Sequence, residues 1–205
     1  MKRMRESYMN DYQIRFLLQS VLGQNVKMSN PADVIKRCVE LADKDMMSGG
    51  RFVCKKFKKK VKKDRVNYTI EMLENSDYKY SSVDKTKVCE DIFWKCDEIR
   101  TIQVNGKERV FKPYGLAQKL INMTFKYLYI YKDYIGKDID FSHCECPVDS
   151  VVLTKLDREE KWTNITIGEY NEIRKCIKEA LDSSKYSLLK EEIGELVFDD
   201  NWINT

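Results

Sequence analysis

Apolar residues recur at helical spacing along most of this 205-residue chain, and this spacing constrains the fold more than any other feature. Apolar side chains that are three and four positions apart form one stripe of an α-helix, which is buried against other elements. The sequence therefore predicts a mainly α, multi-helix fold with about eight helices. Seven of them are expected at residues 11–22, 31–47, 84–100, 116–131, 147–156, 167–181 and 185–197.

Local signals mark several ends of these segments. Asn30-Pro31 provides a capping residue and a proline at the first helical position, and Gly49-Gly50 is expected to end the same helix. Thr166 and Glu169 form the pattern of a capping box. Asn105-Gly106 separates two short runs, 101–104 and 107–111, which predicts one small β-hairpin.

Length and composition limit the class of protein. With 42% hydrophobic and 34% charged residues, the chain is expected to form a single domain, 1–205, with a possible N-terminal helical subdomain over 1–100 and a second part over 101–205. It contains no apolar run of membrane-spanning length, and the first residues do not resemble a signal peptide. We therefore expect no membrane partner and a cytoplasmic location, in which the seven cysteines are mostly free thiols. The oligomeric state is not predicted.

Positive charge is concentrated in residues 54–65, where eight of twelve residues are Lys or Arg. Val53, Phe57 and Val61 are four apart, which predicts an amphipathic helix with a wide lysine face. Such a face is either a solvated helix surface or a surface that follows a phosphate backbone. For the second case, the expected contacts are Lys55, Lys58, Lys59 and Lys62.

The segment 113–119 lies between the predicted hairpin and a long apolar helix. Gly115 is expected to allow a positive φ in a short turn, and a small residue at Ala117 would allow a close approach of the backbone. Outward-pointing N–H groups at the helix start would suit a phosphate, with Lys119 in the first turn. The alternative is an ordinary connection with an exposed lysine.

The segment 146–153 carries a second helix start. Pro147 suits the first helical position, and Asp149 suits the cap or the first turn. Asp149 is therefore either a routine cap or a carboxylate delivered to a site.

The order of these two segments resembles the helix-hairpin-helix DNA glycosylase superfamily, over residues 111–156. In that family a Leu-Pro-Gly-Val-Gly-x-Lys hairpin precedes a Pro-Val-Asp and an apolar helix. By this resemblance Gly115 takes the first hairpin glycine, Leu116 the apolar residue, Ala117 the second glycine, Lys119 the lyase lysine and Asp149 the catalytic aspartate. Tyr114 stands where the family has proline, Ala117 replaces a glycine, and the separation from Lys119 to Asp149 is long.

The resemblance implies a helix-hairpin-helix motif and an enzyme that removes a modified purine, of the 8-oxoguanine type, from DNA. Asp149 would stabilise oxocarbenium character at C1′, and Lys119 would attack the sugar and form a Schiff base. The target base would be extruded into a pocket lined by aromatic and apolar side chains. Tyr114, Gly115, Leu116, Ala117 and Gln118 would contact DNA or a nucleotide, and no cofactor is required.

His143-Cys144-Glu145-Cys146 is the remaining cluster of reactive side chains. A metal site would need further ligands at suitable spacing, and Cys89 and Cys96 are seven apart, so no metal is predicted. His143 is instead expected to line the pocket ahead of Asp149.

Two further functions remain open. The same scaffold could bind or hydrolyse a free nucleoside or a signalling nucleotide. Alternatively, the chain could be a non-enzymatic helical interaction protein, in which Lys119 is solvated and Asp149 is only a cap.

Overall fold

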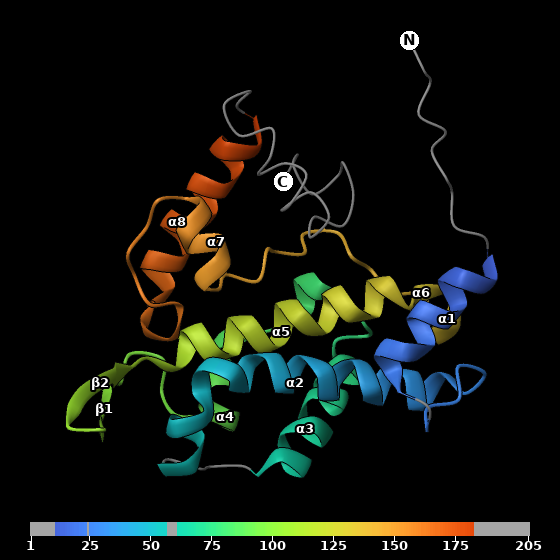
Figure 1. Cartoon of the computed structure of the whole chain (residues 1–205), viewed down its shortest axis with the longest axis horizontal. Coiled ribbons are helices and arrows are strands. Elements are labelled where there is room, and N and C mark those ends of the chain that lie inside the picture. The colour runs from blue at the N-terminus through green and yellow to red at the C-terminus, as the bar shows by residue number, and fades with distance from the viewer. Residues whose placement is uncertain (1–10, 24, 57–60, 183–205) are drawn as a thin grey trace.

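A computed structural model describes residues 11–23, 25–56 and 61–182, which form a mainly α fold with one small sheet (Figure 1). The mainly α prediction and the single hairpin are confirmed. The elements are α1 (Asp11–Leu22), α2 (Pro31–Lys56), α3 (Lys62–Asn75), η1 (Tyr80–Ser82), α4 (Lys85–Ile92), β1 (Arg100–Val104), β2 (Lys107–Phe111), α5 (Pro113–Ile130), α6 (Lys132–Ile135), α7 (Ser150–Lys155), η2 (Trp162–Asn164) and α8 (Ile167–Asp182).

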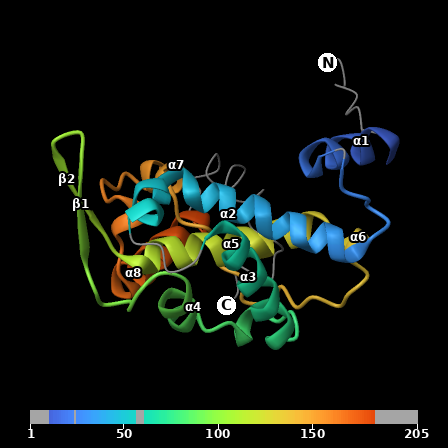
Figure 2. The ribbon, with the colours of Figure 1, turned by 90° about the horizontal axis from the view of Figure 1, so that it is seen from below.

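Helix α5 is the centre of the structure, and α2 packs along it (Figures 1 and 2). Every residue of α5 from 113 to 125 is buried, so this part of the helix is enclosed on all sides. Helix α3 packs against α2, and α4 and η2 pack against α5. The buried apolar residues form one cluster that includes residues from both halves of the chain.

A buried ion pair joins α2 to α3. Arg65 Nε lies 2.6 Å from one carboxylate oxygen of Asp43, and its Nη2 lies 3.0 Å from the other. This bidentate geometry satisfies both charges inside the core and fixes the position of one helix on the other.

The β-hairpin is antiparallel, with Arg100 opposite Phe111 and Val104 opposite Lys107. Asn105 and Gly106 have φ values of 52° and 72°, which a tight two-residue turn requires. The hairpin projects from one end of α5 (Figure 2).

Several predicted boundaries are wrong. Pro147 does not occupy a first helical position, because α7 begins at Ser150 with Asp149 as its cap. Gly49-Gly50 do not end α2, which continues to Lys56, so a cost of about 1 kcal/mol per helical glycine does not stop this helix. The helix expected over 84–100 ends at Ile92, since Phe93 leaves helical geometry. The basic run is not one continuous helix, because Val61 has extended backbone angles and α3 begins at Lys62. The helix expected at 185–197 lies outside the described residues.

The turn expected at 114–117 is also wrong. Pro113 occupies the first helical position, so Tyr114, Gly115, Leu116 and Ala117 are all helical and buried. The element before α5 is the β-hairpin, and a helix-hairpin-helix motif is therefore not confirmed at this point of the chain.

Gly115 is needed for a close approach and not for a positive φ. A Cβ atom at this position would lie 2.0 Å from the backbone carbonyl oxygen of Trp162. The absence of a side chain lets η2 pack directly onto the first turns of α5.

We expect Gly115→Ala to lower the free energy of unfolding by about 1–3 kcal/mol, because backbone must move to accommodate the methyl group. Gly168→Ala is the matched control, since its Cβ would meet only Thr166 Oγ1 at 3.9 Å. Alanine should be neutral or more stable there by up to about 1 kcal/mol. Chemical denaturation measures both variants, and equal stability of the two would contradict this role of Gly115.

Candidate functional site

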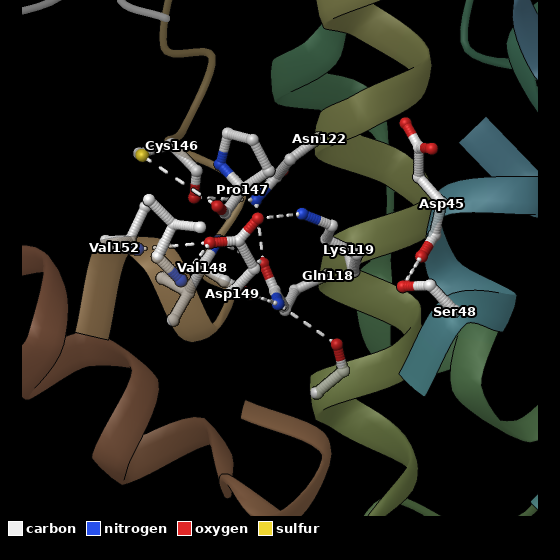
Figure 3. A network of polar contacts seen from close by, with 12 residues as sticks. Asp45, Ser48, Gln118, Lys119, Asn122, Cys146, Pro147, Val148, Asp149 and Val152 are labelled. Atoms are coloured by element: carbon white, nitrogen blue, oxygen red, sulfur yellow. Dashed lines mark hydrogen bonds and ion pairs between the residues drawn. The ribbon is translucent and has the colours of Figure 1, made fainter. Parts of the chain in front are cut away.

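The buried polar side chains of helix α5 include Gln118, Lys119 and Asn122. Buried polar groups need partners, because an unsatisfied one costs about 1–3 kcal/mol. All three find them in one extended segment, 145–149, which runs beside α5 (Figure 3).

The side-chain amide of Gln118 binds both the carbonyl and the N–H of Val148. Its Nε2 donates to the Val148 carbonyl at 2.8 Å, and its Oε1 accepts from the Val148 N–H at 3.1 Å. The Nε2 group also donates to the carbonyl of Gly115 at 3.0 Å. The side-chain amide thus pairs with Val148 as a neighbouring strand would, directly before Asp149.

Asn122 anchors the same segment one turn later. Its Nδ2 donates to the Cys146 carbonyl at 3.2 Å and to the Tyr170 hydroxyl at 2.8 Å, and its Oδ1 accepts from the Tyr80 hydroxyl at 2.6 Å. Tyr170 in turn donates to the buried carboxylate of Glu145. The segment is therefore held to both α5 and α8.

Lys119 and Asp149 form an ion pair, with Nζ 2.6 Å from Oδ2 (Figure 3). The lysine side chain is only 7% exposed and the aspartate side chain is 28% exposed. The other carboxylate oxygen of Asp149 accepts from the N–H groups of Val151 and Val152 and caps α7. The lysine and the aspartate predicted to converge do so, and Lys119 is not solvated as the non-enzymatic alternative expected.

Asp149 is held in its ionised form. Burial opposes the charge, but the adjacent Lys119 ammonium and the two capping N–H groups outweigh it and lower the pKa of Asp149 below its ordinary value of 3.8. The Asp149 carboxylate is therefore charged at neutral pH and is paired with Lys119.

A cavity of about 310 Å³ lies beside this pair. Helix α5 contributes Lys119, Met123 and Lys126, α2 contributes Asp45 and Ser48, and the remaining lining residues are Pro147, Asp149, Ser150 and Trp162. Its volume falls at the lower end of the range for small-molecule pockets, about 300–1,000 Å³.

Trp162 adds an aromatic surface to the cavity. The Lys119 Nζ lies 6.0 Å from the centre of its ring, at the limit of a cation–π contact. The close approach at Gly115 positions η2, and so places this ring beside the ion pair.

The other predicted contact residues do not line this cavity. Tyr114 packs edge-to-face on Tyr170, with ring centres 5.5 Å apart, and Gly115, Leu116 and Ala117 are buried in the core. Gln118 acts through Val148. His143 is exposed with a φ of 65°, because it lies in a turn and not in the extended segment, so the prediction that it lines the cavity is wrong.

The basic run is only partly described. Lys62 is exposed in the first turn of α3, and Lys55 lies in α2 without a described side chain. Lys58 and Lys59 lie outside the described residues, so the predicted phosphate-binding face stays a prediction.

Sequence reasoning missed Asp45, Ser48, Lys126 and Trp162. Lys126 could have been found, because it lies seven residues after Lys119 and so on the same helix face. Asp45 and Trp162 come from other elements, and only tertiary packing brings them to the cavity.

A larger hollow of about 440 Å³ lies between α3 and α4. Two of the carboxylates that line it have structural partners: Asp91 accepts from the Tyr68 hydroxyl at 2.7 Å, and Asp84 caps α4 through the Lys87 N–H. The described residues that line it include no buried lysine–carboxylate pair, so the smaller cavity is the stronger candidate.

Within the described ranges, no three His, Cys, Asp or Glu side chains are grouped so that they could hold a metal ion. The same ranges contain no helix with the length and hydropathy of a membrane span.

The chain matches no protein-family model, and neither a curated protein nor a solved structure matches it. A function for this protein therefore has to be argued from the geometry of the site.

We expect Asp149→Asn to destabilise the fold by about 2–3 kcal/mol, because Lys119 is left buried without a counter-charge. The expected destabilisation is smaller than for a fully buried pair, because the Asp149 side chain is 28% exposed. Asp97→Asn, at an exposed position, is the control. Urea denaturation at pH 7 measures both, and equal midpoints would contradict a stabilising role for the pair.

The stability gap between wild type and Asp149→Asn should close in acid. The folded-state pKa of Asp149 is lowered, so its contribution is full above the unfolded value of about 3.9 and is lost as pH falls through the folded value. Denaturation curves at pH 7, 5, 4 and 3 should converge only below about pH 4. A gap that is constant over this range would show that the aspartate charge is not involved.

Proposed function

We propose that this protein cleaves the N-glycosidic bond of a modified purine in DNA, with Lys119 as nucleophile and Asp149 as the stabilising carboxylate. The observation that carries the proposal is the 2.6 Å contact between these groups at the wall of a cavity that also contains Trp162.

Asp149 supplies the electrostatic part of the chemistry. Cleavage of the bond between C1′ and the base builds positive charge on the sugar, and a fixed carboxylate next to it lowers the barrier. The two capping N–H groups and the Lys119 ammonium keep Asp149 ionised and oriented before substrate enters.

Lys119 supplies the covalent step. Its amine must first give up a proton, for which Asp149 is the acceptor within hydrogen-bond distance. The neutral amine then bonds to C1′ while the bond to the base breaks. The base leaves with the electron pair and takes up the proton that Asp149 accepted, which restores the carboxylate. The new C1′–N bond then loses a proton from nitrogen to Asp149, and its transfer to the ring oxygen opens the sugar and gives a Schiff base between Lys119 and C1′.

Trp162 supplies a flat surface for the extruded base. Stacking on an aromatic side chain contributes about 1–3 kcal/mol per base and compensates part of the cost of unstacking it from the duplex. The exposed lysines that begin α3, Lys62 and Lys63, belong to the basic run that would contact the phosphate backbone.

Binding or hydrolysis of a free nucleoside or nucleotide is the second candidate. The observation that favours it is the volume of the cavity, about 310 Å³, which is suited to one small molecule. The two candidates differ in their salt dependence, since only DNA binding releases many counterions.

Borohydride trapping on a panel of duplexes with single lesions tests the proposal. Wild type should give a covalent adduct, Lys119→Met should give none, and Asp149→Asn should trap about 10²–10³-fold more slowly. Lys107→Ala, on the hairpin away from the cavity, should behave as wild type. Circular dichroism confirms that each variant is folded at the assay temperature.

Absence of any adduct or released base across the panel, with folded wild-type protein, would overturn the proposal. Release of a base from free nucleosides but not from DNA would select the second candidate.

A further inference from the structure

Lys126 lies on the same face of α5 as Lys119 and Met123, at spacings of seven and three residues. All three side chains line the cavity beside the Lys119–Asp149 pair. Seven residues correspond to about 10 Å along the helix axis, so the two lysines mark separate ends of one surface.

Four charged side chains of the described residues face this cavity, and three of them have partners. Lys119 and Asp149 are paired with each other, and Asp45 accepts a hydrogen bond from the Tyr127 hydroxyl at 2.7 Å. In the part of the chain that the structure describes, Lys126 has no hydrogen-bond or ion-pair partner. Among the described residues that line the cavity, it is therefore the one cation that is free to meet a ligand.

The surroundings of Lys126 make its charge costly in the free protein. Its side chain is half-buried, and this burial lowers the pKa of Lys126, with the ammonium of Lys119 acting in the same direction. An anion placed next to Lys126 would stabilise its protonated form. Proteins commonly use a compact lysine ammonium in this way to bind phosphate.

We propose that Lys126 forms a phosphate subsite of the cavity, which binds the phosphate group next to the nucleoside held between Asp149 and Trp162. The identity of that nucleoside ligand rests on the proposed function. The phosphate belongs to a DNA backbone or to a free nucleotide, and both present the same anionic oxygens to the ammonium group.

Equilibrium binding to a duplex with a tetrahydrofuran abasic analogue tests the first source, because this duplex has no base to release and cannot form a Schiff base. We expect Lys126→Gln to weaken binding about tenfold or more and to reduce the slope of log K against log salt by about 0.9. Lys126→Arg keeps the charge and should retain most of the wild-type slope. Lys107→Gln is the control away from the cavity.

Binding of a purine deoxynucleoside and its 5′-monophosphate tests the second source. Wild type should prefer the monophosphate by about tenfold or more, and Lys126→Gln should lose this preference. The pKa of the Lys126 ammonium, followed by NMR, should rise when the monophosphate binds, which a merely structural lysine would not show.

Loss of phosphate-dependent binding in either arm supports the subsite and identifies the source of the phosphate. The subsite would be overturned if Lys126→Gln kept the affinity, the salt slope and the phosphate preference of the wild type. It would also be overturned if the wild-type protein showed no phosphate-dependent binding in either arm. The tetrahydrofuran duplex has no base to release, so with this ligand failure of the glycosylase chemistry and failure of the subsite are observed separately.

Discussion

The site depends on the pairing between the side-chain amide of Gln118 and the backbone of Val148. Two hydrogen bonds, to the carbonyl and from the N–H, fix the extended segment against α5 in one register. Lys119 follows Gln118 and Asp149 follows Val148, so their ion pair is a direct consequence of this register. A slip of one residue would turn Asp149 away and leave Lys119 buried without a counter-charge, at a cost of several kcal/mol. The amide pair and the ion pair therefore enforce each other.

A second set of buried polar contacts supports the segment from its other side. Glu145 accepts from the Tyr170 hydroxyl at 2.9 Å and pairs with Lys85 of α4 at 2.5 Å and with Arg174 of α8 at 2.9 Å. Burial raises the pKa of Tyr170 well above its usual value, so its phenol remains a neutral donor to this carboxylate. Because every polar group of this set has a partner, the set is consistent with a rigid scaffold. Asp149 is thus placed on backbone that is held on both sides, as a preorganised site requires.

The sequence predicted what local patterns determine. The hairpin at Asn105-Gly106 and the capping box at Thr166 depend on neighbouring residues, and both are confirmed. The requirement for glycine at position 115 could not be predicted. It arises from the close approach of the Trp162 carbonyl, and Trp162 lies 47 positions away in the sequence. The convergence of Lys119 and Asp149 could be predicted only as a hypothesis, since each residue alone is also typical of a helix start. Part of the cavity wall comes from α2 and η2, and no pattern around Asp45 or Trp162 indicates where these elements pack.

Asp149 has two roles, and together they distinguish a functional site from a purely structural ion pair. As a cap, it needs only one carboxylate oxygen, which accepts hydrogen bonds from the N–H groups of Val151 and Val152 in α7. The other oxygen is bound to Lys119, and a stabilising purpose alone would be served as well by apolar residues of similar size, because desolvation cancels much of the gain from a buried pair. The pair is instead placed where the aspartate remains partly open to a cavity. An aromatic ring and Lys126, which has no partner among the described residues, line the same cavity. Charges kept at this position are available to a ligand, and this availability is what distinguishes the arrangement from the fully enclosed Asp43–Arg65 pair between α2 and α3.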